Sequence, residues 1–285
     1  MAKSLQQVDI VLNPDNKHWL EIIDWCSKTE GWMFIAEDYT TWMKSFEKFW
    51  YYMCIDRDSQ EAVGGVCMAF DRSASEEPEE DIYYYGFDKM PNYKHNFVAI
   101  PAENVVIPTV VDSQYVIKDL EDVEEADVIA YDIGISRRSR AKYFVNFITT
   151  GKCFTKQFTP TTCVLDRSSL TARLSPAILS TCVFKLFYLS CETGGRRTGY
   201  LLQTFQAIAA SLLAGILSRI PDLRKYKMFA SLYPAINENA TRLFHSIGGT
   251  KAKIVPFTQC QFTKKVFPID DIKVFAMTEC ACSVV

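Results

Sequence analysis

The stretch that most restricts the fold of this chain lies near its C-terminus, at residues 227–249. A β-rich run at 227–232 enters a turn, after which Asn237 and Asn239 offer side-chain oxygens that can cap a helix. Gly248-Gly249 ends that helix, because glycine adopts the left-handed conformation at little cost. Apolar residues recur between these signals at helical spacing: Ala240, Leu243, Phe244 and Ile247. The stretch therefore predicts a strand followed directly by a short helix with one apolar face.

The pattern Asn-x-x-Ala-x-x-Leu-aromatic-x-x-x-Gly, from Asn237 to Gly248, resembles the closing strand–helix unit of the GNAT acyl-CoA N-acyltransferase superfamily. The resemblance implies that this helix borders the pantetheine arm of an acyl-CoA, with Asn237 and Asn239 beside that arm. In the family the helix usually carries a tyrosine that returns a proton to the departing thiolate. Phe244 stands at the aromatic position here, which leaves Tyr233 or Tyr200 as the acid, and we predict Tyr233.

The N-terminal third resembles the opening of GNAT proteins in which a second, diverged module follows the first. A strand at 7–12 precedes two helices, the second at 37–49, and two strands follow at 50–55 and 62–70. After Phe70 the chain runs within about 15 residues into Gly86-Phe87, which resembles the end of a module. The middle of an ordinary module, roughly 40–60 residues of a domain of ~100–150, has no counterpart.

These signals predict an α/β protein with mixed sheets and two GNAT-like units, the first of them abbreviated. The predicted division is 1–100 for the first unit, 101–127 for a linker, 128–279 for the second unit and 280–285 for a tail. Residues 128–130 are expected to form a strand of the linker region. Because the first unit lacks its cofactor helix, one face of its sheet should need a cover from the second unit, a second copy or a protein partner.

A glycine-rich basic loop at 192–200 follows a predicted strand at 183–189 and precedes a predicted helix at 201–220. Backbone N–H groups of such a loop, together with the helix N-terminus, can bind a pyrophosphate. The predicted coenzyme-binding residues are Gly194, Gly195, Arg196, Arg197, Thr198 and Gly199, of which Arg196-x-x-Gly199 resembles half of the superfamily loop. Glu192, at the end of the strand, is the candidate base that removes a proton from the acceptor.

Composition excludes several other classes. The formal charge of −3 offers no general attraction to nucleic acid, and polar residues interrupt the apolar helix at 201–220, which favours a core helix over a membrane span. Eight of the ten cysteines are scattered among apolar neighbours without paired metal spacing, and no secretory signal is visible, which favours buried thiols in the cytoplasm and predicts no metal site. Cys280 and Cys282 are close together in the tail, where we expect accessible, uncoordinated thiols. The terminal Cys282-Ser-Val-Val fits a prenylation signal only loosely. No local Cys/His pairing indicates a nucleophile.

The resemblance implies transfer of an acetyl or other acyl group from acyl-CoA to a primary amine. The alternative is a catalytically inactive module that keeps the fold for binding or interaction. Phe244 and the missing loop of the first unit favour this alternative. The acceptor stays open among a small amine, a peptide N-terminus and a lysine side chain.

Overall fold

The structure is a computed structural model that describes most of the chain. The described residues are 7–29, 36–70, 88–109, 115–119, 122–136, 139, 141–149, 154–160, 170–176, 181–188, 198–220, 222–262, 266 and 269–277. They form two compact units. The small unit contains the described residues up to 70 and residues 142–149, and the large unit contains the others.

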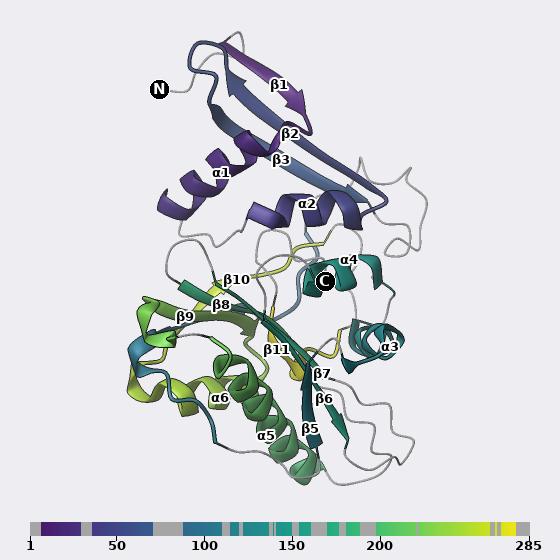
Figure 1. Ribbon diagram of the computed structural model, residues 1–285, viewed down its shortest axis with the longest axis vertical. Helices are drawn as coiled ribbons and strands as arrows, with labels where there is room; N and C mark the ends of the chain where they lie inside the picture. Colours follow the sequence, from purple (N-terminus) through teal and green to yellow (C-terminus); the bar gives the residue numbers. More distant parts are fainter. Residues whose placement is uncertain are drawn as a thin grey trace. The chain divides into compact units, whose positions relative to one another are not determined.

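The small unit is a three-stranded antiparallel sheet with helices packed on one face (Figure 1). Its strands lie in the order β1 (Val8–Leu12), β2 (Lys48–Asp56), β3 (Ala62–Phe70), and its helices are α1 (Asn16–Thr29) and α2 (Ala36–Ser45). Alternate residues of β2 are buried, which is the period of a strand with one covered face. The covered side holds an aromatic core, in which the Trp19 ring stacks on Tyr39 at 5.5 Å and meets Tyr51 edge-on at 5.8 Å.

The helix expected at 37–49 is therefore four residues too long, since α2 ends at Ser45 and β2 begins at Lys48. The apolar residues after Ser45 fit both the spacing of a helix and the alternation of a strand. The buried positions Phe49, Tyr51 and Met53 show that the alternating pattern applies.

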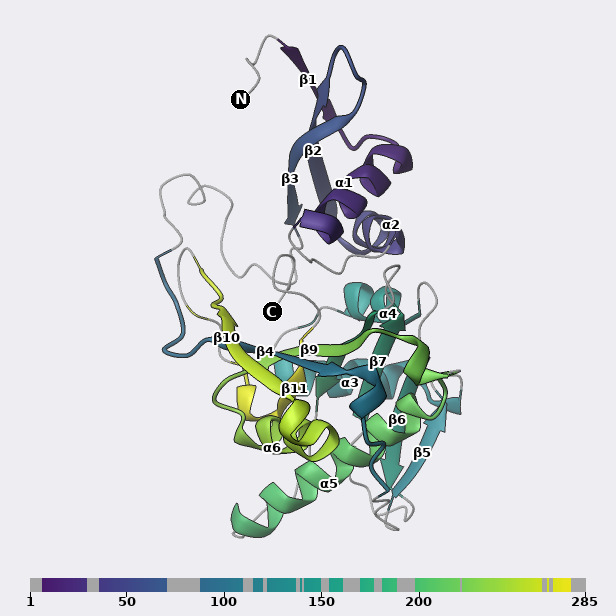
Figure 2. The same ribbon diagram turned by 90° about the vertical axis from the view of Figure 1, so that its left-hand side faces the viewer.

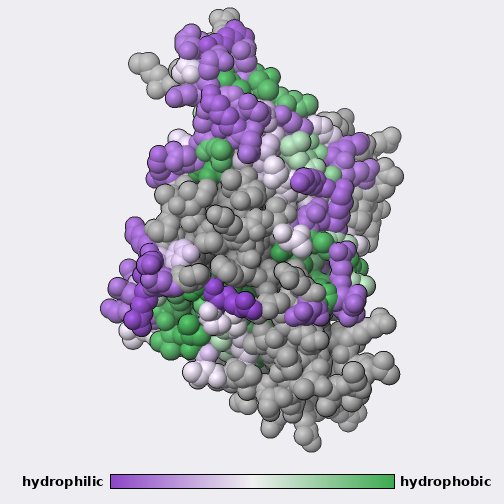
Figure 3. Space-filling model, in the orientation of Figure 1, coloured by the Kyte–Doolittle hydropathy of each residue, from purple (hydrophilic) through white to green (hydrophobic). Residues whose placement is uncertain are grey.

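The other face of this sheet is apolar and open. Strand pairing places Leu12 opposite Tyr52 and Tyr52 opposite Val66, while Met68 lies opposite Trp50 on the same face. The exposed fractions of Leu12, Val66 and Met68 are 48%, 58% and 52%. Figure 3 shows hydrophobic atoms gathered over this sheet, at the top of the view. The sequence predicts that one face of this sheet needs a cover, and the exposed apolar face is the one that would need it.

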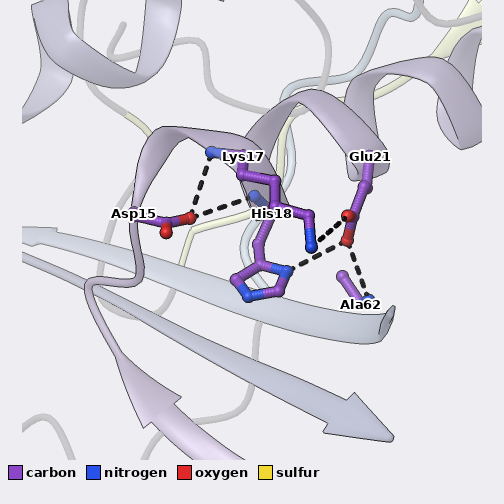
Figure 4. Close-up of polar contacts among 5 residues, drawn as sticks. All are labelled: Asp15, Lys17, His18, Glu21 and Ala62. Carbon is purple, nitrogen blue, oxygen red and sulfur yellow. Dashed lines mark hydrogen bonds and ion pairs between the residues drawn. The ribbon is translucent and has the colours of Figure 1, made fainter. Parts of the chain in front are cut away.

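A polar cluster fastens the start of α1 to the start of β3 (Figure 4). Asp15 Oδ1 accepts hydrogen bonds from the backbone N–H groups of Lys17, at 3.1 Å, and His18, at 3.4 Å. Glu21 Oε2 lies 3.0 Å from His18 Nδ1 and accepts from Ala62 N at 3.1 Å. The hydrogen bond to His18 lowers the pKa of Glu21 against the opposing effect of burial. Three of these bonds satisfy backbone N–H groups at helix or strand ends, so we interpret the cluster as structural.

Helix α4 (Ala141–Thr149) packs within the small unit although it lies far along the chain. The rings of Phe46 and Tyr143 stack at 5.3 Å, and Asn146 Nδ2 donates to Ser45 Oγ at 3.1 Å. These residues fall within the predicted second unit, 128–279, so spatial contacts and chain order divide the molecule differently at this place.

The large unit is built on an eight-stranded sheet. Its strands are β4 (His95–Pro101), β5 (Tyr115–Asp119), β6 (Phe154–Pro160), β7 (Leu170–Pro176), β8 (Thr181–Tyr188), β9 (Met228–Pro234), β10 (Lys253–Thr258) and β11 (Val274–Ala276). Seven follow the order β10-β4-β9-β8-β7-β6-β5, and β11 pairs with β8. All neighbours are antiparallel except β8 and β9, which are parallel. Figure 2 shows β4 lying between β10 and β9, so this early strand is an internal strand of the large sheet.

Helices cover both faces of the large sheet. Figure 1 shows α5 (Thr198–Leu217) and α6 (Glu238–Gly248) on one face and α3 (Glu125–Ser136) on the other. The predicted strand at 128–130 is wrong, because these residues lie in α3. Val128 and Asp132, one helical turn apart, are both buried, and acidic residues in the first turn suit a helix N-terminus.

Helix α5 confirms the predicted helix near 201–220, and its described side chains Ile208, Leu212 and Ile216 are buried. Among the helices that the structure describes, none combines the length and apolarity needed to cross a bilayer.

Candidate functional site

The two parallel strands of the large sheet separate toward their C-terminal ends. Their pairing joins Thr181–Phe184 of β8 to Met228–Ser231 of β9. Further along, β11 pairs with β8, placing Val274 opposite Tyr188, and the N–H of Met277 donates to the carbonyl of Leu232 in β9 at 2.7 Å. The short strand β11 thus bonds to both strands where they part, and its central residue Phe275 is fully buried.

Helix α6 begins beside this point and confirms the predicted strand–helix unit. Asn237 is its N-cap, and Oδ1 of Asn237 accepts from the N–H of Ala240 at 3.1 Å. Nδ2 of the same side chain donates to the carbonyl of Val274 at 2.8 Å. Asn239 does not share the cap, since its Oδ1 accepts from Arg242 Nη2 at 3.0 Å. Asn237 therefore fastens both the start of α6 and the start of β11.

We expect Asn237→Ala to lower the free energy of unfolding by about 1–3 kcal/mol, because it removes the cap and leaves the buried carbonyl of Val274 without this donor. Asn239→Ala is the matched control and should cost less than about 1 kcal/mol, since its partner Arg242 is exposed to solvent. Urea denaturation followed by circular dichroism measures both. Equal losses in the two variants would contradict the assignment of the cap.

The end of α6 also follows the prediction. Gly249 has φ +53° and ψ −137°, a conformation nearly restricted to glycine, and its N–H donates to the carbonyl of His245. A Cβ on Gly248 would lie 2.8 Å from Cδ1 of Ile100 in β4, so helix and sheet approach closely there. The two glycines thus have different tasks, one in turning the chain and one in close packing.

Tyr233, the predicted acid, lies at the end of β9 and is fully buried. Its hydroxyl lies 3.0 Å from Thr241 Oγ1 and 3.4 Å from Asn96 Nδ2, and its ring centroid lies 5.2 Å from that of Phe244. Because Asn96 Nδ2 donates to this hydroxyl, a proton that leaves Tyr233 would pass to Thr241 Oγ1. Phe244 is likewise fully buried, as part of the predicted apolar face of α6.

The rest of the predicted site is described only in part. Glu192, Gly194, Gly195, Arg196 and Arg197 lie outside the described residues. Thr198 and Gly199 form the first turn of α5, and residues 189–197, between β8 and α5, lie outside the described residues. The predicted strand and helix on either side of them are therefore present. The tail cysteines Cys280 and Cys282 also lie outside the described residues.

A second group of polar side chains lies where β4 begins and β10 ends. We call Tyr93, His95, Cys260 and Asp271 the thiol–imidazole cluster. Cys260 Sγ lies 3.9 Å from His95 Nδ1, the Tyr93 and His95 rings meet edge-on at 5.9 Å, and the Tyr93 hydroxyl donates to Asp271. Sequence reasoning missed this group because Cys260 and His95 are 165 residues apart in the chain. Only the pairing of β4 with β10 brings them together.

Burial governs the protonation of this cluster. His95 is 3% exposed, and burial lowers its pKa to about 4, so its imidazole is neutral near pH 7. Burial raises the pKa of Asp271, although the hydrogen bond from Tyr93 acts in the opposite direction. Burial and the bond to Asp271 both raise the pKa of Tyr93. The cluster thus pairs a thiol with a neutral imidazole, which burial makes a weaker base than a free imidazole. Within the described ranges, no three His, Cys, Asp or Glu side chains are grouped to hold a metal ion.

Comparisons with known proteins support the fold. No protein-family model and no curated protein sequence matches the chain. Among solved structures, a tandem GNAT protein from the clavulanic acid biosynthesis pathway is similar, with a TM-score of 0.55 and 8% identity, over 89% of this chain and 97% of that one. A probable N-acyltransferase from Enterococcus faecalis matches with a TM-score of 0.40 and 11% identity, over 88% and 72%. The first likeness confirms the predicted fold, a mixed α/β chain of two GNAT-like units.

Proposed function

We propose that this chain, which has the tandem GNAT fold, is an acyl-CoA-dependent N-acyltransferase that transfers an acetyl or other acyl group to a primary amine. The observation that carries the proposal is the arrangement of the large unit. Parallel strands β8 and β9 separate, a sequence with glycines and arginines stands between β8 and α5, and a capped helix follows β9. The likeness to a tandem GNAT structure over nearly the whole chain supports it.

Each predicted residue has a role in this proposal. Gly194, Gly195, Arg196, Arg197, Thr198 and Gly199 would bind the pyrophosphate through backbone N–H groups and guanidinium groups. Asn237 and Asn239, at the start of α6, would lie beside the pantetheine arm, and Asn237 would act by holding β11 and the helix in place.

The reaction then needs three proton transfers. Glu192 would take a proton from the acceptor ammonium, so that the neutral amine can attack the thioester carbonyl. The C–S bond breaks, and the departing thiolate takes a proton supplied by Tyr233 through its neighbour Thr241, whose hydroxyl lies 3.0 Å away. The nitrogen of the new amide gives up its second proton, which restores the Tyr233 hydroxyl.

Isothermal titration of the full chain with acetyl-CoA tests this proposal. We expect saturable binding in the micromolar to millimolar range that is usual for substrates, roughly 1 μM to 1 mM. A wild-type chain that does not bind acetyl-CoA at millimolar concentration would leave the interaction module as the function of this fold.

We also propose that a second copy of the chain covers the exposed apolar face of β1–β3. The central residues paired across this face, Leu12, Tyr52 and Val66, are uncharged, and an apolar face can pair with itself about a two-fold axis. Sedimentation velocity should show a dimer for the wild type and a monomer for Val66→Glu. The same change at Val255, which is 49% exposed on β10, should leave the dimer intact. A monomeric wild type would rule out the second copy and leave a protein partner.

A further inference from the structure

Hydrogen bonds on both sides of the thiol–imidazole cluster hold the chain segments that carry it. The segments that lead into His95 and away from β10 run side by side, because Lys89 and Phe262 exchange two backbone hydrogen bonds of 3.0 and 2.8 Å. Gln259 Nε2 donates to the carbonyl of Pro91 at 2.6 Å. Thr258 lies opposite His95 in the pairing of β10 with β4. Cys260 is therefore positioned against the imidazole by bonds on both sides of it.

The cluster also borders the point where β8 and β9 separate. His95 lies opposite Pro234, the last residue of β9, and the N–H of Ala235 donates to the carbonyl of Lys94 at 2.9 Å. Asp271, which accepts from Tyr93, opens the turn that leads into β11. Cys260 is half-buried, so part of this residue is accessible to solvent, whereas His95 is enclosed.

We infer that Cys260 is a nucleophile that accepts an acyl group from a thioester, with His95 as its base. The inference rests on the proposed acyl-CoA substrate. Cys260 Sγ forms a bond to the acyl carbon while its proton passes to His95 Nδ1. The bond from the acyl carbon to the coenzyme A sulfur breaks, and His95 returns the proton to the departing thiolate. The product is an S-acyl cysteine and free coenzyme A, from which an amine can take the acyl group in a second transfer.

The chemistry suits the two side chains. A thiol becomes a strong nucleophile when it loses its proton. His95 lies within hydrogen-bonding distance, and because burial makes it a weak base, it takes the proton as the bond to the acyl carbon forms and not beforehand. Tyr93 serves as a positioning residue, because its ring lies edge-on to His95 and its hydroxyl is fixed to Asp271. The cluster therefore has a nucleophile, a base and a group that holds the base.

Two measurements on the full chain test the inference. In the first, limiting iodoacetamide labels the native protein, and peptide mapping compares Cys260 with Cys54, a half-buried thiol of the small unit. We expect Cys260 to react about tenfold faster. The difference should vanish in urea and fall in His95→Gln, which removes the base. In the second, the protein is mixed with acetyl-CoA, quenched in acid and weighed intact. We expect one acetyl group, removable by neutral hydroxylamine, in the wild type and in Cys54→Ser, and none in Cys260→Ser.

The outcomes separate this inference from the proposed function. Equal labelling of Cys260 and Cys54 in the native wild type overturns the nucleophile, even when acetyl-CoA binds, and needs no variant to fold. Rapid labelling without an acetyl adduct, in protein that binds acetyl-CoA by titration, rejects the acyl step and leaves direct transfer to the amine. Absence of both adduct and binding rejects the acyl step together with the proposed function.

Discussion

Phe244→Ala is expected to lower the free energy of unfolding by about 3–5 kcal/mol, the usual cost of removing a buried phenylalanine ring. Phe244 is fully buried between α6 and the sheet, and its ring centroid lies 5.2 Å from that of Tyr233 and 6.3 Å from that of Phe229. The substitution would leave a cavity at the centre of the large unit, where close packing allows little collapse.

Urea denaturation followed by far-ultraviolet circular dichroism measures this loss. Phe257→Ala on β10 is the matched control, since Phe257 is 52% exposed and should cost under about 1 kcal/mol. A loss at Phe244 no larger than at Phe257 would mean that this ring is not in the core. It would also contradict the assignment of α6 as the closing helix of the fold.

The double variant Arg196→Ala/Arg197→Ala is expected to weaken acetyl-CoA binding by roughly 2–4 kcal/mol, or about 30- to 1000-fold in Kd. The two guanidinium groups would bind the pyrophosphate by charge-assisted hydrogen bonds, which contribute about 1.5–3 kcal/mol each before solvent exposure reduces them. These arginines follow two glycines and lie directly before the first turn of α5, where backbone N–H groups also face an anion.

Titration of the double variant with acetyl-CoA measures the effect. Arg219→Ala/Arg224→Ala removes the same charge from two exposed positions beyond the end of α5 and should leave Kd within about twofold. If both double variants bind acetyl-CoA with the same Kd, Arg196 and Arg197 contribute only general positive charge, and the pyrophosphate lies elsewhere. Unfolding curves of both proteins show whether any loss of binding comes from loss of structure.

Local signals in the sequence were sufficient to predict helix α6. Asn237 caps this helix, Gly249 ends it, and the four apolar residues between them are buried. Each signal acts over a single turn of chain, so it can be read without knowing what the helix packs against. The same is true of the hairpin β2–β3 in the small unit, whose two strands were both predicted within two residues.

Predictions failed where the local pattern was ambiguous. Residues 128–130 are β-branched or small and suit a strand, but they lie in α3 because Val128 and Asp132 both face the interior. The cap was assigned to two asparagines, although only Asn237 has its side chain aimed at the helix N-terminus. In both cases the environment of the side chain, which the sequence does not contain, decided between two locally acceptable conformations.

The sequence by itself determined the elements that carry clear local signals, such as α6 and the hairpin β2–β3, because capping, glycine conformation and apolar period depend on neighbours along the chain. The tertiary structure alone decided which distant segments meet. It placed the early strand β4 between β9 and β10, packed α4 against Phe46, and set β11 where β8 and β9 separate. It also brought Cys260 to His95. These pairings depend on backbone hydrogen bonds and buried surface shared between remote residues, and no short window of sequence carries that information.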